Sequence, residues 1–149
     1  MTLPTETPAF TDDEAESRFA NTRSADPFPD IPPALLNSAD IDDYVRATGM
    51  IFPYYPTTKL KSASYEAQIG ELAIYWDNEG HPHEVDLDKD GKVFLEPNSL
   101  IYFMTHQFFR LPDYIALRFN LRITNVHKGL LLGTGPLVDP GFDPSPVLP

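Results

Sequence analysis

From Ile51 onward, the chain is a series of short apolar runs separated by Pro, Gly, Asp and Asn. Residues 115–123, IALRFNLRI, alternate between apolar residues on one face and Arg118 and Arg122 on the other. Similar runs are YEAQIGELAIYW, GKVFLEP, LIYFMTHQFFRL and GLLLG. Many short strands at this spacing predict an all-β fold, either a sandwich or a barrel.

One short helix is predicted ahead of these strands. In LLNSADIDDYVRATGMI, Asn37 or Ser38 can cap its start, and Gly49 is a stop signal. Residues 1–33 are rich in Pro, Thr, Asp and Glu, and DPFPDIPP breaks any periodicity. They are therefore expected to form a disordered or extended acidic arm, with the folded domain spanning residues 34–149.

Composition limits the class of protein. The 149 residues are 42% hydrophobic, which is enough for one compact core. The absence of cysteine excludes disulfides and thiolate-metal sites. A net charge of -11 argues against binding a nucleic-acid polymer, because neutralising phosphates needs clustered Lys and Arg.

No apolar run approaches the roughly 18 to 20 residues that span a bilayer. The first residues, MTLPTETPAFTDDEAESRF, also lack the basic and apolar regions of a signal peptide. The expectation is a cytoplasmic protein without a membrane partner.

Two motifs suggest metal binding only weakly. DLDKDG, residues 86–91, opens like a calcium loop, but Pro97 stands at its twelfth position, so a hairpin turn is favoured. His81 and His83 in HPHE would need further ligands from elsewhere in the fold. We therefore predict no protein-bound metal site.

GLLLGTGPLVDPGF, residues 129–142, is the strongest candidate for a functional site. The Val-Asp-Pro-Gly-Phe turn sets one carboxylate, Asp139, and one aromatic ring, Phe142, on a rigid backbone. Two preceding glycines let that backbone pass close to a ligand. The alternative is a structural corner capped by the Asp139 side chain.

Four motifs in order resemble the dCTP deaminase branch of the dUTPase superfamily. The opening helix LLNSADIDDYVRATGMI and the strand SASYEAQIG come first. LPDYIALRFNLRITNVHKGL matches that family's Leu-Pro-Asp start and arginine motif, and VDPGF matches its Ile-Asp-Pro-Gly-Phe motif. The resemblance runs from about Leu35 to the end of the chain.

The resemblance implies a role for five residues. Asp139 and Phe142 would lie at the deoxyribose. Arg122 would contact phosphate, Thr124 would supply a hydroxyl, and His127 falls where the family has a second arginine. In hydrolysis of the dUTPase kind, Asp139 would be the catalytic base, with Mg²⁺ clamping the phosphates of the nucleotide.

Departures from the family motifs concern deamination. Ile123 stands where the family has its first serine, and Pro149 falls where its catalytic glutamate is expected. Neither residue can take up or return a proton. His127 carries only a conditional positive charge, so phosphate binding should depend on pH. Compared with the family, later strands and a C-terminal lid are expected to be missing.

The resemblance implies a dUTPase-like barrel or jelly roll, of the kind called a β-clip, assembled as a homotrimer with sites between subunits. The expected function is binding, and possibly converting, a pyrimidine deoxynucleoside triphosphate, by dCTP deamination or by dUTP hydrolysis in dUMP supply. The alternative is a catalytically silent trimer that senses nucleotide or binds a protein partner. Whether the chain is an enzyme stays open at this point.

Overall fold

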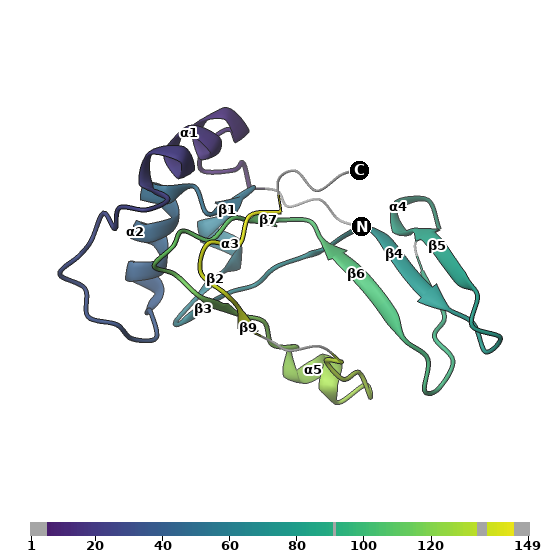
Figure 1. Cartoon of the computed structure of the whole chain (residues 1–149). Helices are drawn as coiled ribbons and strands as arrows, with labels where there is room; N and C mark the ends of the chain where they lie inside the picture. The colour runs from purple at the N-terminus through teal and green to yellow at the C-terminus, as the bar shows by residue number, and fades with distance from the viewer. Residues whose placement is uncertain (1–5, 91, 134–136, 145–149) are drawn as a thin grey trace.

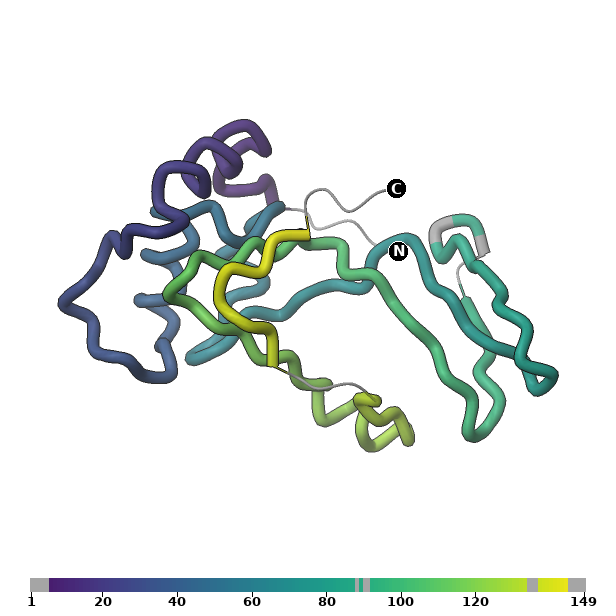
Figure 2. Tube along the Cα trace, viewed as in Figure 1, coloured from purple at the N-terminus to yellow at the C-terminus, as the bar shows by residue number. Residues whose placement is uncertain are grey.

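The computed structural model describes residues 6–90, 92–133 and 137–144. Figure 1 shows a body that holds the two longer helices and most of the short strands, and a three-stranded sheet that stands to one side of it. The same path is visible as a tube in Figure 2. The candidate site belongs to the later part of the chain, which returns across the body.

Five helices occur in the described residues, and three of them are single turns. They are α1 (Asp12–Thr22), α2 (Ser38–Thr48), α3 (Pro56–Lys59), α4 (Leu87–Asp90) and α5 (Ile123–Val126). The described strands are mostly two residues long. They are β1 (Ile51–Phe52), β2 (Leu60–Lys61), β3 (Ser64–Tyr65), β4 (Ile69–Trp76), β5 (Pro82–Asp86), β6 (Ile101–Thr105), β7 (Phe108–Phe109), β8 (Leu117–Arg118) and β9 (Leu137–Val138).

The strands pair in four small sheets, all antiparallel. Three are two-stranded, β1 with β7, β2 with β3, and β8 with β9, and the fourth has the order β5-β4-β6. Strands outnumber helices, which agrees with the all-β, dUTPase-like fold class expected from the sequence. Closure of the sheets into a barrel stays a prediction.

The helix predicted after Asn37 is confirmed as α2. The Asn37 side chain accepts hydrogen bonds from the backbone N–H groups of Ala39 (2.8 Å) and Asp40 (3.2 Å), so it caps the first turn. Gly49 ends the helix in the left-handed conformation, with φ of 66°. A Cβ atom at Gly49 would collide with the backbone of Ala15, so glycine also lets α1 approach the end of α2.

The prediction of a disordered or extended arm over residues 1–33 is wrong for α1. Thr11 and Glu14 form a reciprocal capping box, and Ala15 and Phe19 are buried. Phe10 and Ala15 belong to the same core as Tyr54, so a domain boundary at residue 33 does not separate the described N-terminal residues from the body. Burial of apolar side chains outweighs the Pro-rich and acidic composition of this segment.

The core is built largely from aromatic rings. Tyr54 is fully buried, and its hydroxyl donates a 2.8 Å hydrogen bond to Asp42. Burial is the main cause that raises the pKa of the Tyr54 hydroxyl. Phe10 stacks on Tyr54 with ring centroids 6.1 Å apart. The buried members of this cluster are Phe10, Ala15, Tyr44, Val45, Met50, Ile51, Tyr54 and Phe109.

Four expected details of the β region are wrong. Of residues 115–123, only β8 is a strand, and Ile123 starts α5 and is exposed. The GLLLG run is exposed and contains no strand among its residues. The GKVFLEP run contains no strand in its described residues, 92–97. Residues 87–90 form α4, so the hairpin turn that was placed in DLDKDG lies earlier, between β4 and β5. Gly91 lies outside the described residues.

The alternation itself persists where the strand does not. The alternate residues Ala116, Arg118 and Asn120 are exposed, whereas the large apolar side chains between and beside them are partly buried, namely Ile115, Leu117, Phe119 and Leu121. No described helix has both the length and the apolar character needed to cross a bilayer.

Replacing Phe10 by alanine should lower the free energy of unfolding by about 3–5 kcal/mol, because it removes a buried aromatic ring from the core. Urea unfolding measures this loss. Leu35→Ala is the control, since Leu35 is 87% exposed, and it should change stability by less than about 0.5 kcal/mol. Equal, small effects of both changes would mean that the N-terminal segment does not pack on the core.

Candidate functional site

The Asp139–Phe142 segment forms a tight turn directly after β9. The Phe142 N–H donates to the Asp139 carbonyl at 3.4 Å, and Gly141 lies between them with φ of 79°. Proline followed by a glycine of positive φ is the pattern of a type II turn. The turn expected from VDPGF is therefore present.

The turn is held against a second motif, Leu111-Pro112-Asp113. The Leu111 N–H donates to the Phe142 carbonyl at 2.6 Å, and the Gly141 N–H donates to the Pro112 carbonyl at 3.2 Å. Leu111 and Pro112 are buried, so this support is firm. The fold thus joins two motifs that lie far apart in the sequence.

Asp113 is fixed beneath the turn. Its carboxylate accepts a 2.7 Å hydrogen bond from the Ser24 hydroxyl, and Arg23 Nε lies 3.9 Å away. A Cβ atom at Gly141 would lie 3.1 Å from Asp113 Oδ1. The positive φ therefore favours glycine at this position, and a side chain there would also press on the Asp113 carboxylate.

The Asp139 carboxylate has no hydrogen bond or ion pair with the described residues. An aspartate that caps a turn would accept a backbone N–H there, whereas the Gly141 N–H points to Pro112 instead. An open hollow of about 440 Å³ is lined by residues 137–142, and Phe142 is 46% exposed beside it. Among the described residues the carboxylate therefore has no partner, and the hydrogen bond that would define the structural-corner alternative is not formed with them.

The predicted phosphate-side residues lie at α5. Arg122 precedes the helix, and its guanidinium is 3.5 Å from Glu66 Oε1. Thr124 lies within the single turn of α5, and His127 follows its last residue as the C-cap. Both residues are exposed. Lys61 Nζ also lies 3.8 Å from Glu66 Oε2, so the Glu66 carboxylate forms ion pairs with both Arg122 and Lys61. A phosphate at Arg122 would compete with Glu66 for the same guanidinium.

The structure does not bring Arg122 and Asp139 together through any contact between described residues. In the β8–β9 ladder, Arg118 pairs with Leu137. Asp139 lies beyond one end of this ladder and Arg122 beyond the other, because the strands are antiparallel. In one copy of the chain, the residues predicted to contact sugar and those predicted to contact phosphate therefore lie beyond opposite ends of this ladder.

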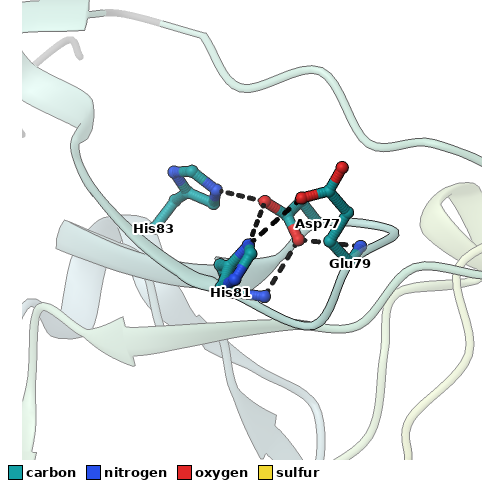
Figure 3. Close-up of polar contacts among 4 residues, drawn as sticks. All are labelled: Asp77, Glu79, His81 and His83. Atoms are coloured by element: carbon teal, nitrogen blue, oxygen red, sulfur yellow. Dashed lines mark hydrogen bonds and ion pairs between the residues drawn. The ribbon is translucent and has the colours of Figure 1, made fainter.

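A hairpin outside this site holds the two histidines that the sequence flagged for metal binding. Figure 3 shows both rings directed at Asp77, which lies at the start of the β4–β5 turn. His83 Nε2 is 2.8 Å from Asp77 Oδ2, and the N–H groups of Glu79 and His81 each donate to Oδ1 at 2.9 Å. Within the described residues, no three His, Asp or Glu side chains are placed to hold a metal ion.

The sequence analysis did not identify two neighbouring polar residues that lie partly or fully inside the fold. Gln107 is buried, and its amide oxygen accepts a 2.8 Å hydrogen bond from the Gln68 backbone N–H. His106 is half-buried, and its Nε2 atom is buried without a hydrogen bond to the described residues. Its ring stacks on Tyr55 with centroids 6.5 Å apart. Neither residue carries a sequence pattern that would have identified it.

Gly141→Ala should destabilise the protein more than Gly80→Ala. Both glycines have positive φ, so each change costs about 1–2 kcal/mol of backbone strain. Only at Gly141 does the new methyl group also crowd a side chain, Asp113, whereas nothing lies within 4 Å at Gly80. Urea unfolding compares the two variants.

Asp139→Asn should leave the free energy of unfolding within about 0.5 kcal/mol of the wild type, because the turn does not use the carboxylate. The same unfolding experiment measures this. A loss as large as that of Gly141→Ala would show that Asp139 is a structural cap.

The hydrogen bond from His83, followed by the backbone donors, holds the pKa of Asp77 well below its usual range. A lowered pKa in the folded state stabilises the hairpin above about pH 4, and this contribution is lost as acid protonates the carboxylate. His83→Gln should therefore raise the pKa of Asp77, as measured by NMR titration of its carboxyl carbon. His81→Gln, which removes a longer 3.5 Å contact, should raise it less, and the reverse order would contradict this arrangement.

Comparison with known proteins gives three similar curated sequences. The dCTP deaminases of Pyrococcus abyssi, Pyrococcus horikoshii and Pyrococcus furiosus are 28%, 27% and 26% identical to this chain over 99 residues. The match covers 66% of this chain and 60%, 59% and 59% of those proteins, so the chain spans under two thirds of their length. No family model matches the chain, and no solved structure matches it either. The similarity supports a relationship to a dCTP deaminase and dUTPase-like family.

Proposed function

We propose that this chain binds a pyrimidine deoxynucleoside triphosphate through the Asp139–Phe142 turn. The observation that carries the proposal is the Asp139 carboxylate, which has no partner among the described residues and lines an open surface hollow, on a turn fixed by backbone hydrogen bonds. A fixed carboxylate can accept a sugar hydroxyl or orient a water molecule without a large ordering cost. The half-exposed ring of Phe142 offers an apolar surface to the sugar.

Arg122, Thr124 and His127 form the phosphate side of the proposed site. All three are exposed and lie in a part of the chain without carboxylates, between residues 114 and 138. Because Arg122 and Asp139 lie at opposite ends of the β8–β9 ladder, a complete site would combine Arg122 of one copy with Asp139 of another. This arrangement accords with a homotrimer that has sites between its subunits.

Mg²⁺ would accompany the triphosphate rather than occupy a protein cage. Mg²⁺ is commonly held by one or two carboxylates together with substrate phosphates. The described residues offer Asp139 near the hollow and no set of three metal ligands. They therefore fit a metal that arrives with the nucleotide.

Of the two reactions in the family, hydrolysis fits these residues better than deamination. Asp139 can act as the base that activates water, whereas Ile123 has no proton to exchange at the position of the family serine. The second candidate is a catalytically silent nucleotide sensor. It is favoured by the pairing of Arg122 with Glu66, which opposes tight phosphate binding.

Calorimetric titration with dCTP, dUTP and dTTP, with and without Mg²⁺, tests the proposal. Asp139→Asn should weaken binding by about tenfold to a hundredfold, because a hydrogen bond to a charged group is worth about 1.5–3 kcal/mol. Asp43→Asn is the control, since Asp43 is exposed on α2, and its affinity should equal that of the wild type.

Three results decide between the outcomes. Pyrophosphate release from a bound nucleotide, lost in Asp139→Asn, would identify a hydrolase, and binding without release would identify a sensor. Ammonia release from dCTP should stay at background. Absence of binding by the wild type to all three nucleotides would overturn the proposal.

A further inference from the structure

The three-stranded sheet has an apolar face that the other described residues cover only in part. Strand alternation and register place five apolar side chains on this face, which we call the apolar sheet face. Ile74 lies opposite Tyr102 on one side and opposite Glu84 on the other. The rings of Trp76 and Tyr102 meet edge to face, 5.3 Å apart. The apolar members are Leu72, Ile74, Trp76, Tyr102 and Met104.

This face is exposed at its β6 edge. Tyr102 is 49% exposed and Met104 is 58% exposed. Figure 1 shows the sheet standing away from α1 and α2, with α4 beside β4 and β5. A small sheet needs an apolar face packed against another element for stability, and exposed apolar patches of this kind mark interaction surfaces.

The apolar sheet face carries an uncompensated negative charge at one position. Glu84 lies opposite Ile74, and Asp86 lies opposite Leu72, where Lys89 pairs with it at 2.8 Å. Glu84 is exposed and forms no ion pair with another described residue. A surface that covers the apolar sheet face must therefore be apolar and offer a cation at Glu84.

One segment of the same chain has this chemistry. Residues 114–138 contain Arg118, Arg122, Lys128 and His127, and no Asp or Glu. Arg118 and Lys128 are exposed and form no ion pair with the described residues. Apolar side chains lie between these cations and are also exposed, namely Ile123, Val126, Leu130, Leu131 and Leu132. We call residues 118–132 the α5 segment.

Within one copy, the two surfaces do not cover each other. Figure 2 shows the α5 segment apart from β4 and β5. The approach of Leu100 to Gly133 marks an edge where the two regions come near one another. The exposure of Tyr102 and of Ile123 shows that the facing surfaces remain open.

We propose that the α5 segment of one copy docks on the apolar sheet face of a second copy. The contact joins unlike surfaces, so it is head-to-tail, and it can close into a ring. Attraction between Glu84 and Arg118 or Lys128 opposes the repulsion expected between chains of net charge -11. Arg118, Lys128 and the apolar side chains of the α5 segment make this contact, and Arg122, Thr124 and His127 are left to the proposed nucleotide site. The contact holds whether or not the chain binds nucleotide.

Two variants of the full chain test the contact. The first, Arg118→Glu with Lys128→Glu, alters the α5 segment, and the second, Tyr102→Ser with Glu84→Lys, alters the apolar sheet face. Light scattering after gel filtration should show an assembly for the wild type and a single chain for each variant. Circular dichroism checks that both are folded. Two control variants make the same kinds of charge change at other exposed sites. Asp43→Lys replaces an acid by a base, as Glu84→Lys does, and Lys92→Glu replaces a base by an acid, as Lys128→Glu does. Both controls should assemble.

Mixing the two variants gives the decisive result. The first variant keeps an intact apolar sheet face, which can accept the intact α5 segment of the second variant. The α5 segment of the first variant and the sheet face of the second are both altered, so they cannot add a further chain. The mixture should therefore form a species of two chains and no larger one. A mixture that stays monomeric, or a single variant that still assembles, would overturn the proposal.

A wild-type chain that is monomeric but binds nucleotide would overturn this inference and the site shared between copies, and would leave nucleotide binding at the Asp139–Phe142 turn standing. An assembly that shows the expected mixing result but binds no nucleotide would overturn the proposed nucleotide binding and leave the docking contact standing. The two proposals can therefore fail separately.

Discussion

The pairing of β1 with β7 is the constraint on which the candidate site depends. Ile51 lies opposite Phe109, and both are buried in the aromatic core. The Arg110 N–H continues this pairing by donating to the Met50 carbonyl at 2.9 Å. Leu111 follows at once and donates to Phe142. A continuous set of backbone hydrogen bonds therefore leads from the core to the turn that presents Asp139.

Sequence signals were reliable where the structure that they predict is formed by neighbouring residues alone. Asn37 and Gly49 bound α2 as expected, because caps act within one helical turn. The Val-Asp-Pro-Gly-Phe turn follows from proline and glycine in the same way. The capping box of Thr11 and Glu14 was also readable, but the Pro-rich and acidic composition around it favoured a disordered arm.

Features set by packing between distant segments were not readable. The alternation in residues 115–123 indicated which side chains face the core, yet it did not show that the chain turns into α5 at Ile123. The β4–β5 turn begins at Asp77, whose carboxylate is fixed by His83 across the hairpin. The separation of Arg122 from Asp139 follows from the antiparallel register of β8 and β9, which no local pattern reveals.

The position of the single tryptophan has a spectroscopic consequence. Trp76 ends β4, in the three-stranded sheet, whereas Tyr44 and Tyr54 are buried in the core of the body. Intrinsic tryptophan emission therefore reports the surroundings of that sheet and not the packing of the body. The chain carries an optical reporter of one of its two regions without any added label.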